Sequence, residues 1–209
     1  LVGSEMCIRD RNMDYYDILI DGISAEIYVS RIIHTRSWIA AELSDGRYGI
    51  ALHDKLQSRE RMFPTLEGLT ARKAAEAVRS WNLLEASEAM AVINAFYNTE
   101  ERLDKLSARC GFDKSCTQGF STEGKKVALI GHLVLQPDAL KGASEVYIIE
   151  RDPKPGDYPD SACEYILPES DIVIMTASAA INKTLPRLLE LSKNAVSIII
   201  GPTTPLCPE

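Results

Sequence analysis

The chain has 209 residues, of which 45% are hydrophobic and 25% are charged, with a formal net charge of −7. This composition is typical of a globular protein and excludes a disordered chain, a collagen and a small disulfide-rich domain. The acidic excess would repel nucleic-acid phosphates and anionic lipids, so a small-molecule or protein partner is favoured over either of them. No apolar run is long enough for a membrane span, the longest being Val196 to Ile200.

Five scattered cysteines indicate a reducing compartment, and we therefore expect a cytoplasmic protein. The first residues, Val2 to Arg11, resemble a translated sequencing-adaptor read. We accordingly treat residues 1–11 as foreign and expect the natural start at or upstream of Met13.

Residues 12–106 predict an α+β domain. A short helix over 13–21 precedes a strand signal at Ile27 and Val29. Runs 38–43 and 47–53 flank Asp45-Gly46, a dipeptide typical of a hairpin turn with positive φ at both central positions. The period then changes, which predicts a helix over 70–81, capped by Thr70, and a second helix over 83–98.

Residues 107–125 are rich in Gly, Ser, Thr and Lys and predict a linker. Beyond it, residues 126–209 contain four aliphatic runs, each of which predicts a buried strand, and a helix over 182–192. Such runs, separated by helical or crossover segments, indicate a parallel sheet of Rossmann-like topology. Because no helix follows the last run, we expect this domain to be truncated at its C-terminus. The four runs are 126–131, 146–150, 172–176 and 196–200.

Ligands of open parallel sheets bind beyond the carboxyl ends of the strands, so the residues after each run are candidates. Glu150 lies 19 residues after Gly131, where a dinucleotide-binding fold places its ribose-binding acid. The first turn has one glycine instead of three, however, which disfavours an NAD dehydrogenase. Glu150 therefore fits either a hydroxyl contact or a solvated strand end. The other strand-end candidates are Thr176, Gly201, Thr203 and Thr204.

His132, after the first strand, could ligate a metal or carry protons, or be an ordinary loop residue. Asp157 lies in a Pro/Gly-rich loop that could either cover a ligand or merely connect elements. Asn182 fits a helix N-cap or an anion site, and capping is the favoured reading. Cys110 and Cys116 are separated by five residues, which does not match a zinc knuckle.

The helix predicted over 83–98 carries two stripes. Leu83, Ala86, Met90, Ile93 and Tyr97 form a core stripe. Beside it runs a stripe of small and amide residues, and asparagine is unfavourable within a helix, so its presence there needs a reason. The amides could face a ligand or the other domain, or they could be a solvated flank near the helix end. This second stripe is Ser87, Ala91, Asn94 and Asn98.

Taken in order, these strings resemble the bacterial and archaeal family labelled "putative heavy-metal chelation". The resemblance rests on the strings around Asn94 and Asn98, at Gly131-His132, around Glu150 and Asp157, at Asn182-Lys183-Thr184, and at Gly201-Pro202-Thr203-Thr204. It implies an enolase-N-terminal-like α+β domain joined to a Rossmann-like domain, with a site between them. Relatives continue beyond the point at which this chain ends.

The leading hypothesis is a cleft between the two domains that binds a small polar ligand, a transition metal or a metal chelate. His132, Glu150 and Asp157 would supply charged or ligating groups, with His132 as the candidate metal ligand. Gly131, Thr176, Asn182, Gly201, Thr203 and Thr204, with Asn94 and Asn98, would complete the site. The alternatives are a nucleotide- or S-adenosylmethionine-type enzyme and a non-catalytic partner of a transport system. Homo-oligomerisation is left open, and neither nucleic acid nor membrane is an expected partner.

Overall fold

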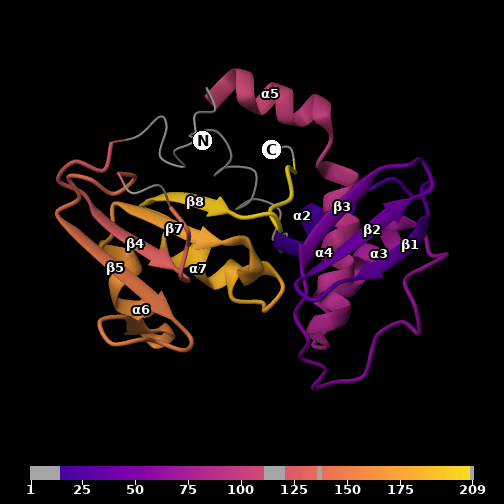
Figure 1. Ribbon diagram of the computed structural model, residues 1–209, viewed down its shortest axis with the longest axis horizontal. Coiled ribbons are helices and arrows are strands. Elements are labelled where there is room, and N and C mark those ends of the chain that lie inside the picture. The colour runs from indigo at the N-terminus through magenta and orange to yellow at the C-terminus, as the bar shows by residue number, and fades with distance from the viewer. Residues whose placement is uncertain (1–14, 111–120, 136–137, 208–209) are drawn as a thin grey trace. The chain divides into compact units, whose positions relative to one another are not determined.

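The computed structural model describes residues 15–110, 121–135 and 138–207 (Figure 1). The adaptor-like start therefore lies outside the described residues. By their internal contacts the residues divide into two compact units. Unit 1 contains the residues up to Leu103 together with the segment that begins at Pro202, and unit 2 runs from Asp104 to Gly201.

Unit 1 contains a three-stranded antiparallel sheet in the order β1-β2-β3. Its strands are β1 (Val29–His34), β2 (Trp38–Leu43) and β3 (Tyr48–Leu52). The predicted hairpin is confirmed, with Trp38 paired to Leu52 and Glu42 to Tyr48. Its turn differs from the expectation: among the described residues between these strands only Gly46 has a positive φ, of 85°, and Leu43 N donates to Arg47 O. This is the geometry of a three-residue loop with a left-handed glycine, not of a two-residue turn.

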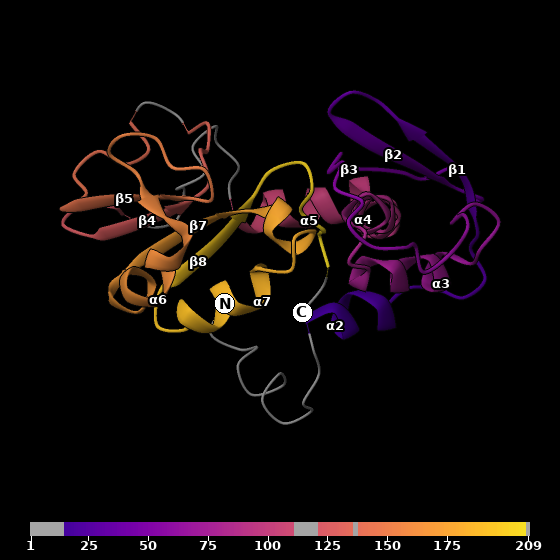
Figure 2. The ribbon, with the colours of Figure 1, turned by 90° about the horizontal axis from the view of Figure 1, so that it is seen from below.

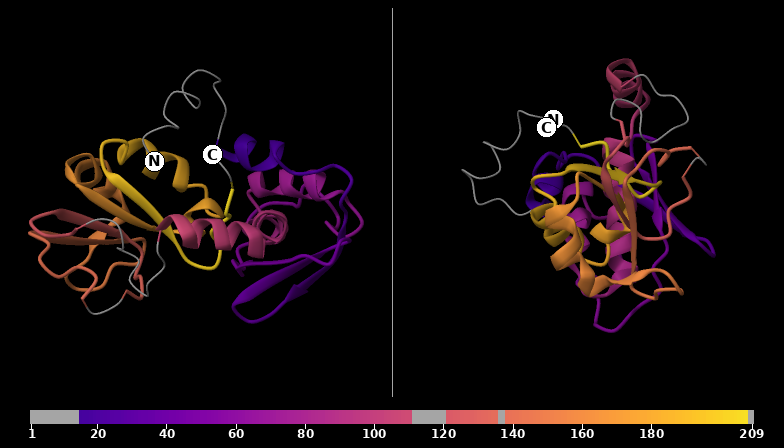
Figure 3. Two further views of the ribbon diagram at one scale, coloured as in Figure 1. Left: turned by 90° about the horizontal axis from the view of Figure 1, so that it is seen from above. Right: turned by 90° about the vertical axis from the view of Figure 1, so that its left-hand side faces the viewer.

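The helices of unit 1 form two further layers behind the sheet. Figure 2 looks along α4 (Leu83–Tyr97), which lies between the sheet and the helices α2 (Tyr15–Asp21) and α3 (Ala71–Ala75), and the left view of Figure 3 shows the same layers. Thr70 caps α3 as predicted by accepting a hydrogen bond from Lys73 N. The helix predicted over 70–81 is shorter, because a 3₁₀ turn (Glu76–Arg79) replaces its second half.

Helix α4 is buried on nearly all sides, since only Leu84 and Phe96 of its residues are not buried. This explains why Ser87, Ala91 and Asn94 are buried as fully as the predicted core stripe. The helix touches the sheet at Gly49, where an added Cβ would lie 2.0 Å from Ala95 N. The sheet packs closely against one side of α4, and α2 and α3 lie on its other side. Helix α4 therefore has no solvent-facing stripe.

Helix α5 (Glu100–Cys110) extends into the segment predicted to be a linker. Residues 107–110 are thus helical, and the absence of a lasting apolar period there did not prevent helix formation. The rest of the predicted linker includes residues 111–120, which lie outside the described residues.

Unit 2 is built on a five-stranded parallel sheet in the order β6-β5-β4-β7-β8. Its strands are β4 (Lys126–Ile130), β5 (Glu145–Glu150), β6 (Tyr158–Pro159), β7 (Ile172–Thr176) and β8 (Val196–Ile200). The parallel sheet predicted from the aliphatic runs is confirmed, and β6 is an added two-residue strand in the Pro/Gly loop. Val127, Leu129, Ile172 and Ile174 form its core cluster.

The order of the strands reverses at the middle of the sheet. From β4 the chain moves outward to β5 and β6, and then returns to β7 and β8 on the other side of β4. Helices α6 (Cys163–Ile166) and α7 (Leu185–Leu191) cover one face of the sheet (Figure 2). In open parallel sheets, the carboxyl edge beside such a reversal is where ligands bind.

None of the helices that the structure describes combines the length and the apolar character that a bilayer span requires.

Candidate functional site

A cavity of about 560 Å³ opens at the carboxyl ends of β4, β5 and β7 in unit 2. This volume lies in the range of small-molecule sites. Its wall combines strand ends with the segment around α6 and with α7. Of the residues predicted from the sequence, those that line it are Gly131, His132, Glu150, Thr176 and Asn182.

The imidazole of His132 lies between two carboxylates. Its Nδ1 is 3.1 Å from Glu150 Oε1, and its Nε2 is 2.8 Å from Asp157 Oδ2. His132 N also donates to Glu150 Oε1, at 2.7 Å. Gly131, just before His132, has a φ of 98°, which residues with a side chain rarely adopt. This glycine turns the chain so that His132 N can reach Glu150. The end of β4, the end of β5 and the loop after β5 therefore meet at one ring.

Asp157 is the most buried of the three side chains. Its side chain is 8% exposed, compared with 24% for Glu150 and 35% for His132. Asp157 Oδ2 also accepts a hydrogen bond from Lys154 N at 2.8 Å, which fixes the carboxylate within its own loop. The predicted loop residue is thus a positioning group for His132, and Glu150 is the carboxylate that faces the cavity.

Hydroxyl and amide groups form the wall beyond β7. Thr176 Oγ1 lies 2.9 Å from Ser178 Oγ. Asn182 Oδ1 accepts hydrogen bonds from Thr184 N and Thr184 Oγ1. Asn182 is not the N-cap favoured from the sequence, because α7 begins at Leu185 and its N-cap position is Thr184. The side chain instead closes a turn just before the helix.

The wall residues that were not predicted include Cys163, Glu164 and Arg187. Arg187 forms a two-pronged ion pair with Glu164 across 23 positions of sequence, which no local pattern signals. Burial raises the pKa of the Cys163 thiol to about 11, so this thiol stays protonated at neutral pH. Cys163 is 8% exposed at this wall.

The other predicted residues lie outside this cavity. Gly201 directly follows β8, has a φ of 113° and is exposed. Thr203 is 3% exposed and belongs to unit 1, where its Oγ1 accepts a hydrogen bond from Leu52 N at 3.0 Å. The residues after Gly201 therefore belong to unit 1. The sequence could not show this, because residues that follow a strand look the same whether they line a site at its end or leave for another unit.

Asn94 and Asn98 bind the same returning segment. Asn98 Nδ2 donates to Thr204 O at 3.0 Å, and Asn98 Oδ1 accepts from Leu206 N at 2.7 Å. Asn94 Nδ2 donates to Ile50 O at 2.7 Å and to Pro202 O at 3.4 Å. Asn94 Oδ1 is buried without a hydrogen-bond partner in the described part of the chain. The two amides thus hold backbone within unit 1.

The donor set does not by itself fit a metal ion at His132. Both ring nitrogens contact carboxylate oxygens, so neither is open in this arrangement. Across residues 15–110, 121–135 and 138–207, no group of three or more His, Cys, Asp or Glu side chains is placed to hold an ion.

The fold is that of an α/β protein with an antiparallel sheet in one unit and, in the other, a parallel sheet with a cavity at the carboxyl ends of its strands. The chain belongs to the DUF364 family. A DUF364-family crystal structure from Desulfitobacterium hafniense is 35% identical, with a TM-score of 0.74, over 92% of this chain and 78% of that one. Two family profiles, both described as "putative heavy-metal chelation", match residues 16–97 and 120–209.

Two further relatives extend the comparison. A DUF364-family structure from Pyrococcus horikoshii shares the fold, with a TM-score of 0.64 and 22% identity over 90% of this chain and 79% of that one. An uncharacterized protein of Methanocaldococcus jannaschii is 29% identical over 139 residues, or 62% of this chain. The matched part spans about half, 51%, of that protein's length.

Proposed function

We propose that the cavity of unit 2 binds a small polar ligand that brings its own metal-coordinating groups, in the class of a metal chelate. The observation that carries this proposal is the His132 ring held between Glu150 and Asp157 at the wall of a cavity of about 560 Å³. The carboxylate of Glu150 and the hydroxyls of Thr176 and Ser178 in this wall can accept hydrogen bonds from the hydroxyl and amine groups of such a chelate.

The description of the family profiles supports the choice of a metal-bearing ligand. Since both nitrogens of His132 are engaged, the ligand would carry most of the coordination, and the chain would recognise its outer groups. Glu150, with Thr176 and Ser178, would accept hydrogen bonds from ligand hydroxyl or amine groups. Asp157 would keep the ring in place without touching the ligand.

Calorimetric titration tests this proposal. The probes are Ni²⁺, Co²⁺ and Zn²⁺ as free ions, citrate alone, and each ion with citrate. We expect His132→Ala to abolish the heat seen with at least one citrate complex, and Glu169→Gln, an exposed change outside the cavity, to preserve it. The proposal fails if no complex gives heat, or if His132→Ala binds as the unaltered chain does.

A nucleoside-type ligand is the second candidate, favoured by the position of Glu150. This carboxylate ends the strand next to β4 and lines the cavity, as the ribose-binding acid does in dinucleotide folds. Stabilisation by adenosine or S-adenosylmethionine in a thermal-shift measurement, removed by Glu150→Gln, would establish it. Stabilisation by neither compound would exclude it.

We propose further that unit 1 is enolase-N-terminal-like and unit 2 is Rossmann-like. Support comes from the three-stranded meander backed by helices in unit 1 and from the strand order of unit 2. A reducing, cytoplasmic location is proposed with them, in keeping with the unpaired state of Cys163 and Cys207 among the described residues.

A further inference from the structure

Two histidines meet at one end of the unit 1 sheet, outside the cavity described above. His34 is the last residue of β1, opposite Ile39 on β2, and His53 directly follows β3. His53 N donates to Ser37 O at 3.0 Å, which continues the pairing of the strands past Leu52. The two imidazole rings have centroids 5.4 Å apart and planes inclined at 48°.

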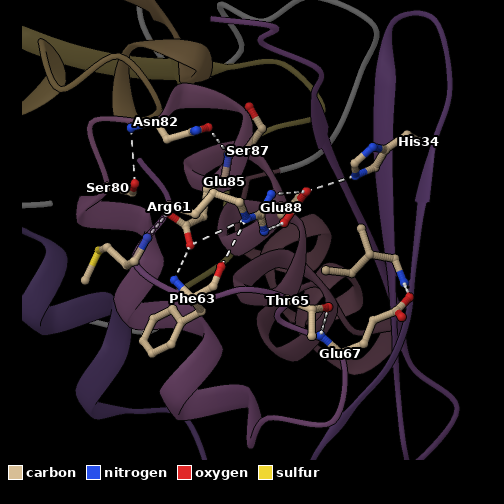
Figure 4. Close-up of polar contacts among 12 residues, drawn as sticks. His34, Arg61, Phe63, Thr65, Glu67, Ser80, Asn82, Glu85, Ser87 and Glu88 are labelled. Atoms are coloured by element: carbon tan, nitrogen blue, oxygen red, sulfur yellow. Dashed lines mark hydrogen bonds and ion pairs between the residues drawn. The ribbon is translucent and has the colours of Figure 1, made fainter. Parts of the chain in front are cut away.

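One nitrogen of His34 is held by a buried carboxylate. His34 Nε2 lies 3.1 Å from Glu88 Oε1, and the Glu88 side chain is only 5% exposed (Figure 4). The guanidinium of Arg61 donates hydrogen bonds to both carboxylate oxygens of Glu88, at 3.1 Å to Oε1 and 2.5 Å to Oε2. A carboxylate so held acts as an acceptor, so His34 Nε2 carries the hydrogen and the lone pair of the neutral ring is on Nδ1.

The opposite nitrogen of His53 is held by a backbone carbonyl. His53 Nδ1 lies 2.5 Å from Thr35 O. Because a carbonyl oxygen can only accept, Nδ1 carries the hydrogen, and the lone pair of the neutral ring is on Nε2. Each ring thus has one nitrogen fixed by an acceptor and one without a partner among the described residues.

This arrangement is the one found around metal-binding histidines, which donate their second N–H to a carboxylate or a backbone carbonyl. Two imidazoles on one ion, with metal–nitrogen bonds of about 2.1 Å, would have centroids about 5 Å apart. The observed separation of 5.4 Å is close to this value. The His34 side chain is 40% exposed, so an ion in solvent can reach the pair.

We infer that His34 and His53 form a two-imidazole site for a transition-metal ion of the Zn²⁺, Ni²⁺ or Cu²⁺ class. Glu88 and the carbonyl of Thr35 are the positioning groups that set the two tautomers. Two imidazoles leave further coordination positions for water or for groups of a ligand. A purely structural pair would need only the fixed nitrogen of each ring, whereas a metal site needs the other nitrogen to be free.

Calorimetry on the full chain without a histidine tag tests this site, with Zn²⁺ and Ni²⁺ as the probes. His34→Gln and His53→Gln keep an N–H donor for Glu88 and Thr35 but remove the imidazole, so the fold is expected to survive. Each should abolish the heat, while His132→Ala should leave it unchanged. Equal heat in the unaltered chain and in both glutamine variants, or no heat in any of them, would overturn the inference.

The control with His132→Ala separates this site from the proposed function, because citrate complexes report on His132 and free ions on His34 and His53. Far-ultraviolet circular dichroism and urea unfolding establish that each variant is folded. If both glutamine variants unfold, Glu88→Gln decides: it keeps an acceptor for His34 and should weaken binding about 10-fold or more without abolishing it. Unchanged affinity in Glu88→Gln would contradict the positioning role.

Nitrogen-15 spectra of the imidazoles identify the coordinating atoms. Addition of Zn²⁺ should shift Nδ1 of His34 and Nε2 of His53, while the nitrogens that face Glu88 and Thr35 remain protonated. Shifts at the opposite nitrogens, or none at either ring, would contradict the assignment.

Discussion

His34 in unit 1 and His132 in unit 2 both lie against carboxylates, yet they differ in what remains free. Glu150 and Asp157 engage both nitrogens of His132, whereas Glu88 engages only one nitrogen of His34. Whether an imidazole can bind an ion therefore depends on how many of its two nitrogens are already engaged by acceptors. His132 is a fixed part of a cavity wall, and His34 keeps an open lone pair.

The carboxylates of the two units differ as well. Glu85 is fully buried and accepts hydrogen bonds from Met62 N and Phe63 N, which fixes the loop before α3 (Figure 4). Glu150 is partly exposed and faces a cavity. Unit 1 uses its buried acids to hold its own backbone and side chains, whereas Glu150 in unit 2 lines a cavity. The following predictions test that contrast.

The largest effect is expected for Gly49→Ala in unit 1. A Cβ there would lie 2.0 Å from Ala95 N and 2.4 Å from Ala91 O, both backbone atoms of α4, so the helix that carries Glu85 and Glu88 must move. We expect a loss of about 4 kcal/mol or more in the free energy of unfolding, measured with urea. Gly46→Ala, which has open space around it, should cost only about 1 kcal/mol. Equal losses would contradict the close packing.

Glu85→Ala should destabilise the chain by about 3 kcal/mol, because it removes a fully buried side chain and leaves the N–H groups of Met62 and Phe63 without their acceptor. Glu150→Ala should cost less than about 1 kcal/mol, since its carboxylate is partly solvated. Both are measured by urea unfolding, and Glu85→Gln, which keeps one acceptor oxygen, should fall between them. The contrast between the units fails if the two alanine variants lose the same stability.

Cys163 tests whether the unit 2 cavity contains a reactive thiol. With its pKa raised to about 11 by burial, the thiol should react with iodoacetamide at pH 8 about 100-fold more slowly than in urea. Peptide mapping by mass spectrometry follows this cysteine separately from the others. A rate close to that of the unfolded chain would instead indicate an accessible thiolate in the cavity.

The smallest effect concerns Asp171, just before β7. Its carboxylate accepts a hydrogen bond from Lys126 N and lies near the Lys125 ammonium, which lowers its pKa in the folded state. A lowered pKa adds stability above the unfolded value, about 3.9, and this is lost as the pH falls through the folded value. Asp171→Asn should therefore be slightly less stable than the unaltered chain at pH 7, with a difference that shrinks below about pH 4. A constant difference would contradict this linkage.

Much of the fold could be predicted because its signals are local. The runs at 172–176 and 196–200 coincide with β7 and β8, since a buried parallel strand requires a short aliphatic run. The hairpin around Gly46 was predicted from another local signal, the Asp45-Gly46 dipeptide between two strand-like runs. The start of α7 and the shortened helix after Thr70 were missed, because tertiary packing decides where a helix begins and ends.

The site was predictable only in part. Strand-end logic found Gly131, His132, Glu150 and Thr176, because the carboxyl ends of parallel strands share one edge. It failed for Thr203 and Thr204, where the chain leaves the sheet for the other unit. His34 and His53 lie 19 positions apart, and only the pairing of the strands brings their rings together. The sequence does not show the register of these strands, so it could not predict that the two histidines are neighbours.

The return of the chain to unit 1 after Gly201 makes that unit discontinuous in sequence, with unit 2 inserted within it. A fragment that stops at residue 106 would leave Leu52 N without its Thr203 acceptor, and Asn98 without Thr204 and Leu206. Dissection of this protein by limited proteolysis or by separate expression should therefore retain the residues from Pro202 onward with the first half. If the chain is cut once, at either boundary of unit 2, and both fragments are kept, the donors and acceptors of these hydrogen bonds all remain in the sample.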